Sequence, residues 1–263
     1  MKIAFFDIDG TLTSEKDGRV PESAKKAIRR AREAGNLMFI NTGRCFQNVE
    51  QRFRDVGFDG YVNGCGTHIM IGGETIHYHP QPPERIKEIL RLSRETCVDT
   101  LFECRYFVTF DHRHTLKNPN AIKQRDRFLE RNYDIALDVD APDFTCDKFV
   151  FWFSDESQLK AMREYTDNYF ECINRSPDFR EFVPIGYSKA TGIQRVLDHY
   201  SLPLESAYAF GDSMNDEAML SYVKHSVVMG NYESPEILKT AAHVAGKASE
   251  DGLANALEEL GFF

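Results

Sequence analysis

Hydrophobic positions in the first 80 residues fall into a repeating pattern that predicts strands and helices in turn. Residues 3–6 are continuously apolar, and so is LMFIN (37–41) up to its final asparagine, as expected of short strands that are buried on both faces. Between these two runs, apolar residues recur at helical spacing, beginning after Pro21 and ending at Gly35. This order predicts a parallel sheet whose strands are joined by right-handed crossovers.

The pattern changes after residues 80–83, Pro-Gln-Pro-Pro, which form the densest proline cluster of the chain and predict a domain boundary. The elements expected beyond it are helices near 84–98, 121–131 and 156–170, strands at 101–110 and 148–153, and a pair of strands near 171–185. Apolar and polar residues alternate in the strand at 101–110, and we interpret the segment as a separate α+β unit with a largely antiparallel sheet. We therefore predict an α/β protein: a Rossmann-like parallel-sheet core (residues 1–80 and 188–263) with an inserted α+β domain (residues 81–187).

Composition narrows the classes of function. The chain of 263 residues carries 32 basic and 41 acidic side chains, a net charge of −9, which disfavours nucleic acid or an anionic membrane as the main partner. No apolar stretch approaches the ~20 residues that span a bilayer, and the first residues do not predict a secretory signal. Six scattered cysteines without a C-x-x-C pair predict neither a disulfide framework nor a zinc site, and favour a cytoplasmic protein.

Two aspartates, Asp7 and Asp9, end the first predicted strand, in the segment FFDIDGTL (5–12). Because strand side chains repeat with period two, both carboxylates leave the strand on one side. Carboxylates this close repel each other, and a divalent cation or a shared proton relieves the repulsion. Gly10 then allows a tight turn whose amide groups can approach an anion. The segment favours a phosphoryl-group site, although an acidic turn would contain the same residues.

Further polar residues follow later predicted strands or begin a helix: Thr42 with Gly43, Asp212 with Asn215 and Asp216, and Lys189. In an open parallel sheet, ligands bind beyond the carboxyl ends of the strands, so these residues are expected to meet the acidic pair. Each segment alone is explained by turn formation or helix capping. Their combination favours a site that handles phosphate.

The four segments resemble the four motifs of the haloacid dehalogenase superfamily of phosphotransferases. The matching residues are FFDIDGTL, INTGR, the single lysine of GYSKATG, and FGDSMND. The large insert before the third motif, with VVMGN (227–231) near the end, is similar to Cof-type phosphatases with a C2-type cap, which implies that residues 81–187 form that cap. Ala190 and Cys65 depart from the usual subfamily residues, but neither departure removes a reacting group.

The chemistry and the resemblance assign the same catalytic roles. Asp7 would attack phosphorus in line and carry an aspartyl-phosphate. Asp9 would protonate the leaving alkoxide and later accept a proton from water, a role that requires its pKa to lie above that of Asp7. Thr42 and Lys189 would bind phosphoryl oxygens and offset the developing charge.

Mg²⁺ is the expected cofactor, since this ion binds few protein oxygens together with substrate phosphate and water. The resemblance implies that its ligands are the carboxylates of Asp7 and Asp212 and the backbone carbonyl of Asp9. Asn215 would contact the phosphate or the metal's surroundings, and Asp216 would order Lys189 or a metal-bound water.

Substrate contacts are less well defined by the sequence. The candidates by position are Gly10, Gly43, Arg44, Asn63, Asn215 and Arg105. In cap-bearing members of the superfamily the leaving group is selected by residues of the cap. The aromatic residues around Trp152 are expected to form the core of that cap.

These observations predict a Mg²⁺-dependent phosphomonoesterase of small phosphorylated metabolites, sugar phosphates first, acting as a monomer or homodimer. A phosphotransferase or phosphomutase of the same fold is the near alternative, and product analysis would separate the two. A receiver-like phospho-accepting signalling domain also combines Asp, Thr, Lys and Mg²⁺. Receivers are shorter, however, and their phosphorylated Asp follows a later strand. A catalytically inactive binding protein is disfavoured, because no reacting group is missing.

Overall fold

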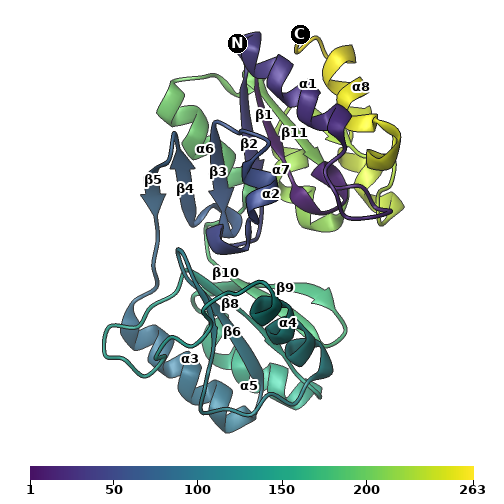
Figure 1. Ribbon diagram of the computed structural model, residues 1–263. Helices are drawn as coiled ribbons and strands as arrows, with labels where there is room; N and C mark the ends of the chain where they lie inside the picture. Colours follow the sequence, from purple (N-terminus) through teal and green to yellow (C-terminus); the bar gives the residue numbers. More distant parts are fainter. The chain divides into compact units, whose positions relative to one another are not determined.

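The computed structural model describes residues 1–263, and the chain forms two compact units (Figure 1). The first unit comprises residues 1–44, 49–77 and 187–263, and the second comprises residues 45–48 and 78–186. The sequence prediction placed the borders at 80/81 and 187/188, and it did not anticipate that 45–48 pack with the second unit. No helix combines the length and the apolar character needed to cross a membrane.

The first unit is built on an eight-stranded sheet in the order β13-β12-β11-β1-β2-β3-β4-β5 (Figure 1). Its strands are β1 (Ile3–Phe6), β2 (Leu37–Asn41), β3 (Gly60–Asn63), β4 (His68–Ile71), β5 (Glu74–Tyr78), β11 (Ala207–Gly211), β12 (His225–Val228) and β13 (His243–Val244). The strands from β13 to β3 pair in parallel, and β4 pairs antiparallel to β3. The predicted α/β class with a parallel-dominated sheet is confirmed.

Helices cover both faces of this sheet: α1 (Glu22–Glu33), α2 (Gln51–Arg54), α6 (Lys189–Tyr200), α7 (Glu217–Tyr222) and α8 (Gly252–Glu259). Strand β1 is buried throughout. Ala4 and Phe6 pack in the core formed with α1 and α8, whereas Ile3 and Phe5 pack in the core formed with α6 and α7. Burial on both faces explains why β1 is a continuous apolar run.

The strand ends of the first unit are aligned by their register. Phe6, the last residue of β1, pairs with Ile40 of β2 and with Phe210 of β11. The residues that follow these three therefore leave the same edge of the sheet. This edge carries Asp7 and brings the polar segments after β2 and β11 beside it.

The second unit contains a five-stranded antiparallel sheet in the order β7-β6-β8-β10-β9. Its strands are β6 (Asp99–Glu103), β7 (Val108–Phe110), β8 (Lys148–Trp152), β9 (Phe170–Ser176) and β10 (Phe179–Pro184), and its helices are α3 (Pro83–Thr96), α4 (Pro119–Glu130) and α5 (Glu156–Thr166). Helices α3 and α5 contribute to the core on one face of this sheet, with Phe102, Phe149 and Phe182. Helix α4 packs on the other face through Ala121 and Phe128.

The prediction of one strand over residues 101–110 is wrong. The chain reverses between Glu103 and Val108, where the backbone N–H of Cys104 donates to the carbonyl oxygen of Phe107 at 2.8 Å. This turn contains no glycine or proline. The sequence pattern therefore showed no break between the two strands and predicted a single one. The other expected elements of this unit are present with shifted ends.

Residues 45–48 pack entirely with the second unit. Cys45 belongs to its core on the α4 face, and the backbone N–H of Val108 donates to Oε1 of Gln47 at 2.9 Å. The hydroxyl of Tyr133 donates to the carbonyl oxygen of Gln47 at 2.8 Å. Cys45 is buried, and this burial raises the pKa of its thiol.

Candidate active site

Asp7 leaves β1 at the sheet edge and is almost completely buried. Its backbone N–H continues the sheet by donating to the carbonyl oxygen of Phe210 at 3.1 Å. The chain then makes a turn over Ile8–Leu12, in which Gly10 has a φ of 74°. This left-handed conformation favours glycine, and it carries the chain back over the end of the strand.

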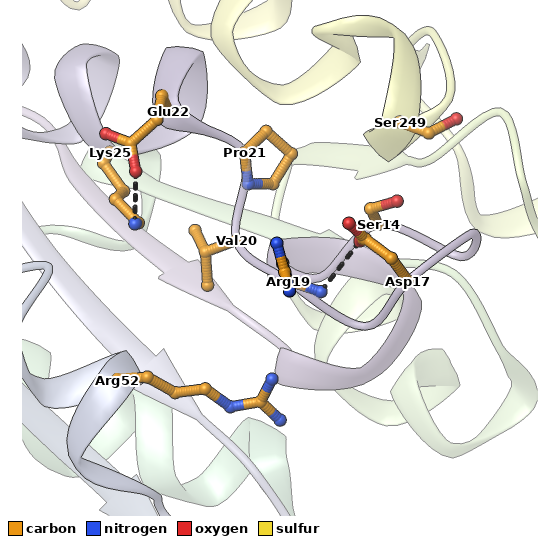
Figure 2. Close-up of a pocket in the computed structure, with 9 residues that line it drawn as sticks. All are labelled: Ser14, Asp17, Arg19, Val20, Pro21, Glu22, Lys25, Arg52 and Ser249. Carbon is orange, nitrogen blue, oxygen red and sulfur yellow. Dashed lines mark hydrogen bonds and ion pairs between the residues drawn. The ribbon is translucent and has the colours of Figure 1, made fainter.

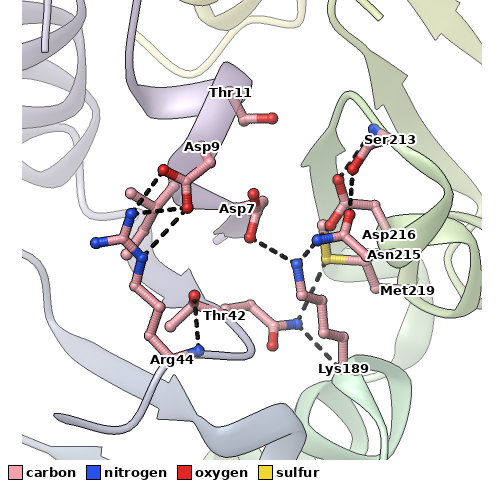
Figure 3. Close-up of polar contacts among 12 residues, drawn as sticks. Asp7, Asp9, Thr11, Thr42, Arg44, Lys189, Ser213, Asn215, Asp216 and Met219 are labelled. Carbon is pink, nitrogen blue, oxygen red and sulfur yellow. Dashed lines mark hydrogen bonds and ion pairs between the residues drawn. The ribbon is translucent and has the colours of Figure 1, made fainter. Parts of the chain in front are cut away.

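Lys189 joins two of the predicted site carboxylates (Figure 3). Its Nζ donates to Oδ1 of Asp7 at 2.6 Å and to Oδ1 of Asp216 at 2.5 Å. Lys189 is the first residue of α6, whose N-terminus is capped by Ser188. All three charged side chains are buried, so their interactions are weakly screened by water.

Asp216 also orders the loop that carries Asp212. Its Oδ2 accepts hydrogen bonds from the backbone N–H groups of Asp212 at 3.0 Å and Ser213 at 3.3 Å. Asp212 in turn accepts a hydrogen bond from the Thr11 hydroxyl at 3.0 Å. Asp216 therefore has a double role, since it holds both the lysine and the loop after β11.

The site holds more buried carboxyl groups than its one ammonium group can compensate. Burial raises the pKa of Asp7 to about 6, against the opposing effect of Lys189, and burial raises the pKa of Asp212 to about 8. Burial alone would lower the pKa of Lys189, but Asp216 and Asp7 raise it, so the lysine stays charged. Lys189 contacts two of the three buried carboxyl groups, and a divalent cation would offset the remaining imbalance.

The side chains here fit such a cation. Carboxylate oxygens of Asp7, Asp212 and Asp216 lie within 4.8 Å of one another, and hard divalent ions prefer oxygen ligands. A Cβ atom at Gly10 would lie 2.2 Å from Oδ2 of Asp212, so only glycine leaves the Asp212 carboxylate its space. The sequence prediction named the carboxylates of Asp7 and Asp212 and the backbone carbonyl of Asp9 as metal ligands. The buried carboxylate cluster contains Asp7, Asp212 and also Asp216.

Asp9 occupies a different environment from Asp7. Its side chain is 72% exposed, and Nη2 of Arg44 bonds both of its carboxylate oxygens, at 2.6 and 2.7 Å (Figure 3). Arg44 was a candidate phosphate contact, and the structure places it on Asp9. Asp7 is the buried member of the acidic pair, and this burial raises its pKa.

The side chains of Thr42, Asn63 and Asn215 form no hydrogen bond with Asp7. Thr42 is buried and accepts a hydrogen bond from the backbone N–H of Arg44 at 3.2 Å, across the half-buried Gly43. Asn63 is fully buried at the end of β3, and neither polar atom of its side chain has a hydrogen-bond partner. The side-chain oxygen of Asn215 accepts from the Ser213 hydroxyl.

Sequence reasoning missed three supporting residues: Thr11, Asn41 and Asn231. The side-chain amide of Asn41 donates to the carbonyl oxygen of Lys189 at 3.0 Å. That of Asn231 donates to the carbonyl oxygen of Gly10 at 2.7 Å, which ties the turn after β1 to the segment after β12. The sequence contained one signal for each of these two residues. Asn41 is a polar residue at the end of the apolar run LMFIN, and Asn231 is the last residue of VVMGN.

A cavity of about 650 Å³ in the first unit lies away from these residues (Figure 2). It is lined by residues between Ser14 and Lys25 together with Arg52 and Ser249, and it includes none of the site acids. Volume alone therefore does not mark the reactive centre of this protein. The buried charges at the strand ends mark it.

Comparison with known proteins agrees with this geometry. The family model of the haloacid dehalogenase-like hydrolases matches residues 4–257. A putative phosphatase of Bacillus subtilis, YkrA, is 29% identical over 99% of this chain and 98% of its own length. An HMP-PP phosphatase of Yersinia enterocolitica is 24% identical over 98% of this chain and 94% of its own.

Two solved structures superpose over the whole chain. The phosphatase BT1666 of Bacteroides thetaiotaomicron has a TM-score of 0.84 and is 25% identical, with 96% of its own chain covered. The sugar phosphatase BT4131, described as haloacid dehalogenase subclass IIB, has a TM-score of 0.81 and is 26% identical over 100% of both chains.

The fold and the site thus define a hydrolase with a parallel-sheet core and an inserted second domain. The chain belongs to the haloacid dehalogenase-like hydrolase family. The resemblance seen in the four motifs is confirmed, and so is the predicted enzyme class, a hydrolase of phosphate esters.

Proposed function

We propose that this protein is a Mg²⁺-dependent phosphomonoesterase that uses Asp7 as its nucleophile. The observation that carries the proposal is the double contact of Lys189 with Asp7 and Asp216 at the carboxyl ends of β1 and β11. This contact holds a carboxylate at the sheet edge where open α/β folds bind ligands. It also places a permanent positive charge beside the position at which phosphoryl charge would develop.

Asp7 is suited to nucleophilic attack because Lys189 fixes the orientation of its carboxylate. The bond from Nζ engages Oδ1, which leaves Oδ2 to attack phosphorus and form an aspartyl-phosphate, with departure of the alkoxide. Water then attacks the phosphorus of this intermediate, and the bond to the Asp7 oxygen breaks. Inorganic phosphate and the original carboxylate are the products.

Asp9 would donate the proton to the leaving alkoxide and accept one from the attacking water. Its exposed carboxylate is the one side chain of the acidic pair that does not face Lys189. Arg44 holds it in place through both oxygens. For proton delivery, this ion pair must open when substrate binds.

Asp7 and Asp212, with the backbone carbonyl of Asp9, would hold Mg²⁺, and Asp216 lies close enough to order its surroundings. The bound ion would supply positive charge that compensates the buried carboxylates and the substrate phosphate. The site chemistry supports a hard divalent cation, and Mg²⁺ is the member of that class most often paired with phosphate.

We propose small phosphorylated metabolites as substrates, with sugar phosphates first. The structure of the sugar phosphatase BT4131, similar over the full length of this chain, supports this choice. The Yersinia relative carries a different name, HMP-PP phosphatase, so the panel of test compounds must extend beyond sugars.

The test is a phosphate-release assay over a panel of phosphorylated metabolites, with and without Mg²⁺. We expect release from at least one sugar phosphate, loss of release after EDTA, recovery with added Mg²⁺, and none with Asp7→Asn. Activity that persists unchanged in EDTA would contradict the metal assignment. An isomerised sugar phosphate without free phosphate would indicate a mutase.

A further inference from the structure

The loop between β3 and β4 contains three consecutive residues with positive φ, namely Gly64 at 56°, Cys65 at 56° and Gly66 at 91°. All three are buried. Four of the five non-glycine residues with positive φ lie at helix ends, where this conformation is common: Cys97, Asn132, Ser201 and Asp251. Cys65 lies between two glycines instead, so the surrounding structure holds it in a strained conformation.

One side of this left-handed turn binds the segment after β2. The backbone N–H of Gly64 donates to the carbonyl oxygen of Arg44 at 2.9 Å, and that of Cys65 donates to the carbonyl oxygen of Thr42 at 3.1 Å. The backbone N–H of Thr42 donates in return to the carbonyl oxygen of Val62 at 2.9 Å. These bonds join main-chain atoms only, so the conformation of the turn determines where Thr42 and Arg44 lie.

The other side of the turn packs directly against the first turn of α6. A Cβ atom at Gly66 would lie 2.8 Å from the carbonyl oxygen of Ser188 and 3.2 Å from the backbone nitrogen of Gly192. That oxygen and that nitrogen are joined by a hydrogen bond of 3.0 Å within α6. A Cβ atom at Gly192 would lie 2.3 Å from Cγ1 of Val62. The two glycines therefore allow a main-chain contact that a side chain would force apart.

Lys189 depends on the position of this helix start (Figure 3). Its buried Nζ lies 2.6 Å from Oδ1 of Asp7 and 2.5 Å from Oδ1 of Asp216. Hydrogen bonds weaken steeply as their geometry departs from the optimum, so a displacement of the helix start by about 1 Å would disturb both contacts. The side-chain amide of Asn41 already holds the carbonyl oxygen of Lys189 at 3.0 Å. Gly66 supplies the second point at which the start of α6 is fixed.

We propose that the turn Gly64–Gly66 is a positioning element of the active site, with Gly66 and Gly192 as its positioning residues. The turn fixes Thr42 on one side and Lys189 on the other, so one rigid unit sets the distance between these two groups. Neither glycine touches the substrate, and each acts through Lys189. The inference rests on the proposed phosphatase function, in which Thr42 and Lys189 bind phosphoryl oxygens.

Gly66→Ala tests the contact, and Gly73→Ala is its matched control. Gly73, in the hairpin between β4 and β5, has a φ of 87°, so alanine strains the backbone similarly at the two positions. A Cβ atom at Gly73 would meet nothing within 4 Å. We expect kcat of Gly66→Ala to fall about a hundredfold, with KM changed by less than about threefold. Gly73→Ala should keep the wild-type constants, and equal kcat values in the two variants would overturn the proposal.

A second set of variants separates positioning from a general loss of stability. Gly192→Ala brings a methyl group against Val62 and should lower kcat about tenfold by displacing the start of α6. Val62→Ala removes the colliding Cγ1, so Gly192→Ala/Val62→Ala should recover kcat to within about threefold of the wild type. Because Val62→Ala shortens a core side chain, a merely structural effect would make the double variant worse. A double variant no more active than Gly192→Ala would contradict the proposal.

Urea unfolding followed by circular dichroism tests the same link without turnover. Gly66→Ala should lower the urea midpoint more than Gly73→Ala does, because it also weakens the contacts of Lys189. In a Lys189→Met background this excess should shrink, whereas the effect of Gly73→Ala should be the same as before. An unchanged excess in that background would overturn the proposal.

The two kinds of measurement separate this inference from the proposed function. A wild-type protein that releases no phosphate from any compound would refute the phosphatase function, and the unfolding measurements would still decide whether the turn positions Lys189. Where Gly66→Ala does not fold, Gly192→Ala takes its place in both measurements, with the same expected differences from Gly73→Ala.

Discussion

Nη2 of Arg44 bonds both carboxylate oxygens of Asp9, at 2.6 and 2.7 Å, and Nε adds a third contact at 3.2 Å. The guanidinium also lies 3.5 Å from Glu50 and packs over the ring of Phe53. An exposed carboxylate would otherwise sample several rotamers. Arg44 therefore defines where the proposed acid and base group stands before substrate arrives.

This pair predicts an unequal response to two substitutions at Arg44. Lysine keeps the charge but cannot bond both oxygens in the same planar fashion, and alanine keeps neither property. We expect kcat/KM to fall about tenfold in Arg44→Lys and further in Arg44→Ala, since bonds to charged groups contribute about 1.5–3 kcal/mol. Steady-state kinetics measure the effect. Arg29→Ala, at an exposed position of α1, is the control, and equal activity of all the variants would contradict the assignment.

Lys189 should be essential to folding stability as well as to activity. Lys189→Met leaves Asp7 and Asp216 buried without a positive partner, which costs about 3–5 kcal/mol. Urea unfolding at neutral pH should show this loss of unfolding free energy. The double variant Lys189→Met/Asp216→Asn removes one of the two carboxylates left without a positive partner. It should therefore recover part of the lost unfolding free energy. A single variant as stable as the wild type would show that the buried contacts are energetically neutral.

Gly10 and Gly18 form a matched pair for testing the space beside Asp212. Both have positive φ, 74° and 68°, so alanine strains the backbone similarly at the two positions. A Cβ at Gly10 would lie 2.2 Å from Asp212, whereas one at Gly18 would meet nothing within 4 Å. We expect Gly10→Ala to lose most activity and metal affinity, and Gly18→Ala to lose only about 1–2 kcal/mol of stability. Similar activity in both would argue against a crowded site.

The buried charges of the second unit predict a pH dependence of stability. Burial alone would raise the pKa of Glu181, but Lys148 and Arg175 lower it from 4.5 to about 2. Because the folded pKa lies below the unfolded one, this stabilisation is complete above pH 4.5 and disappears as the pH falls toward 2. The contribution is on the order of 3 kcal/mol.

Glu181→Gln should therefore lower the unfolding free energy at pH 7. It should also reduce the loss of unfolding free energy that occurs as the pH falls from about 4.5 to 2. Urea unfolding followed by Trp152 fluorescence measures both effects within this unit. Glu171→Gln, at an exposed position of β9, provides the control. An unchanged acid limb in Glu181→Gln would show that another group dominates the titration.

Much of the site was predictable because parallel strands end at one edge. Once Asp7, Asp212 and the start of α6 were assigned to that edge, their meeting followed from topology. The bond from Lys189 to Asp216 also agrees with the predicted role of Asp216. Short-range sequence patterns carry this information because each residue lies at a strand end or a helix start.

Other features depend on side-chain geometry that the pattern does not contain. Arg44 is the last residue of the second motif and could equally have reached a phosphate or a carboxylate. Its contact with Asp9 depends on the turn made by residues 8–12. The relative burial of Asp7 and Asp9 has the same origin. The hairpin turn at 104–107 contains neither glycine nor proline, so no residue type in the sequence predicted a turn there.

The central claim is that Asp7 carries the phosphoryl group during turnover. Acid quenching during steady-state hydrolysis of a good substrate, followed by peptide mass spectrometry, measures this directly. The account predicts one phosphoryl group on the peptide that contains Asp7, absent in Asp7→Asn and present in Asp9→Asn. Phosphoryl label on another residue, or full activity with no label on Asp7, would contradict it.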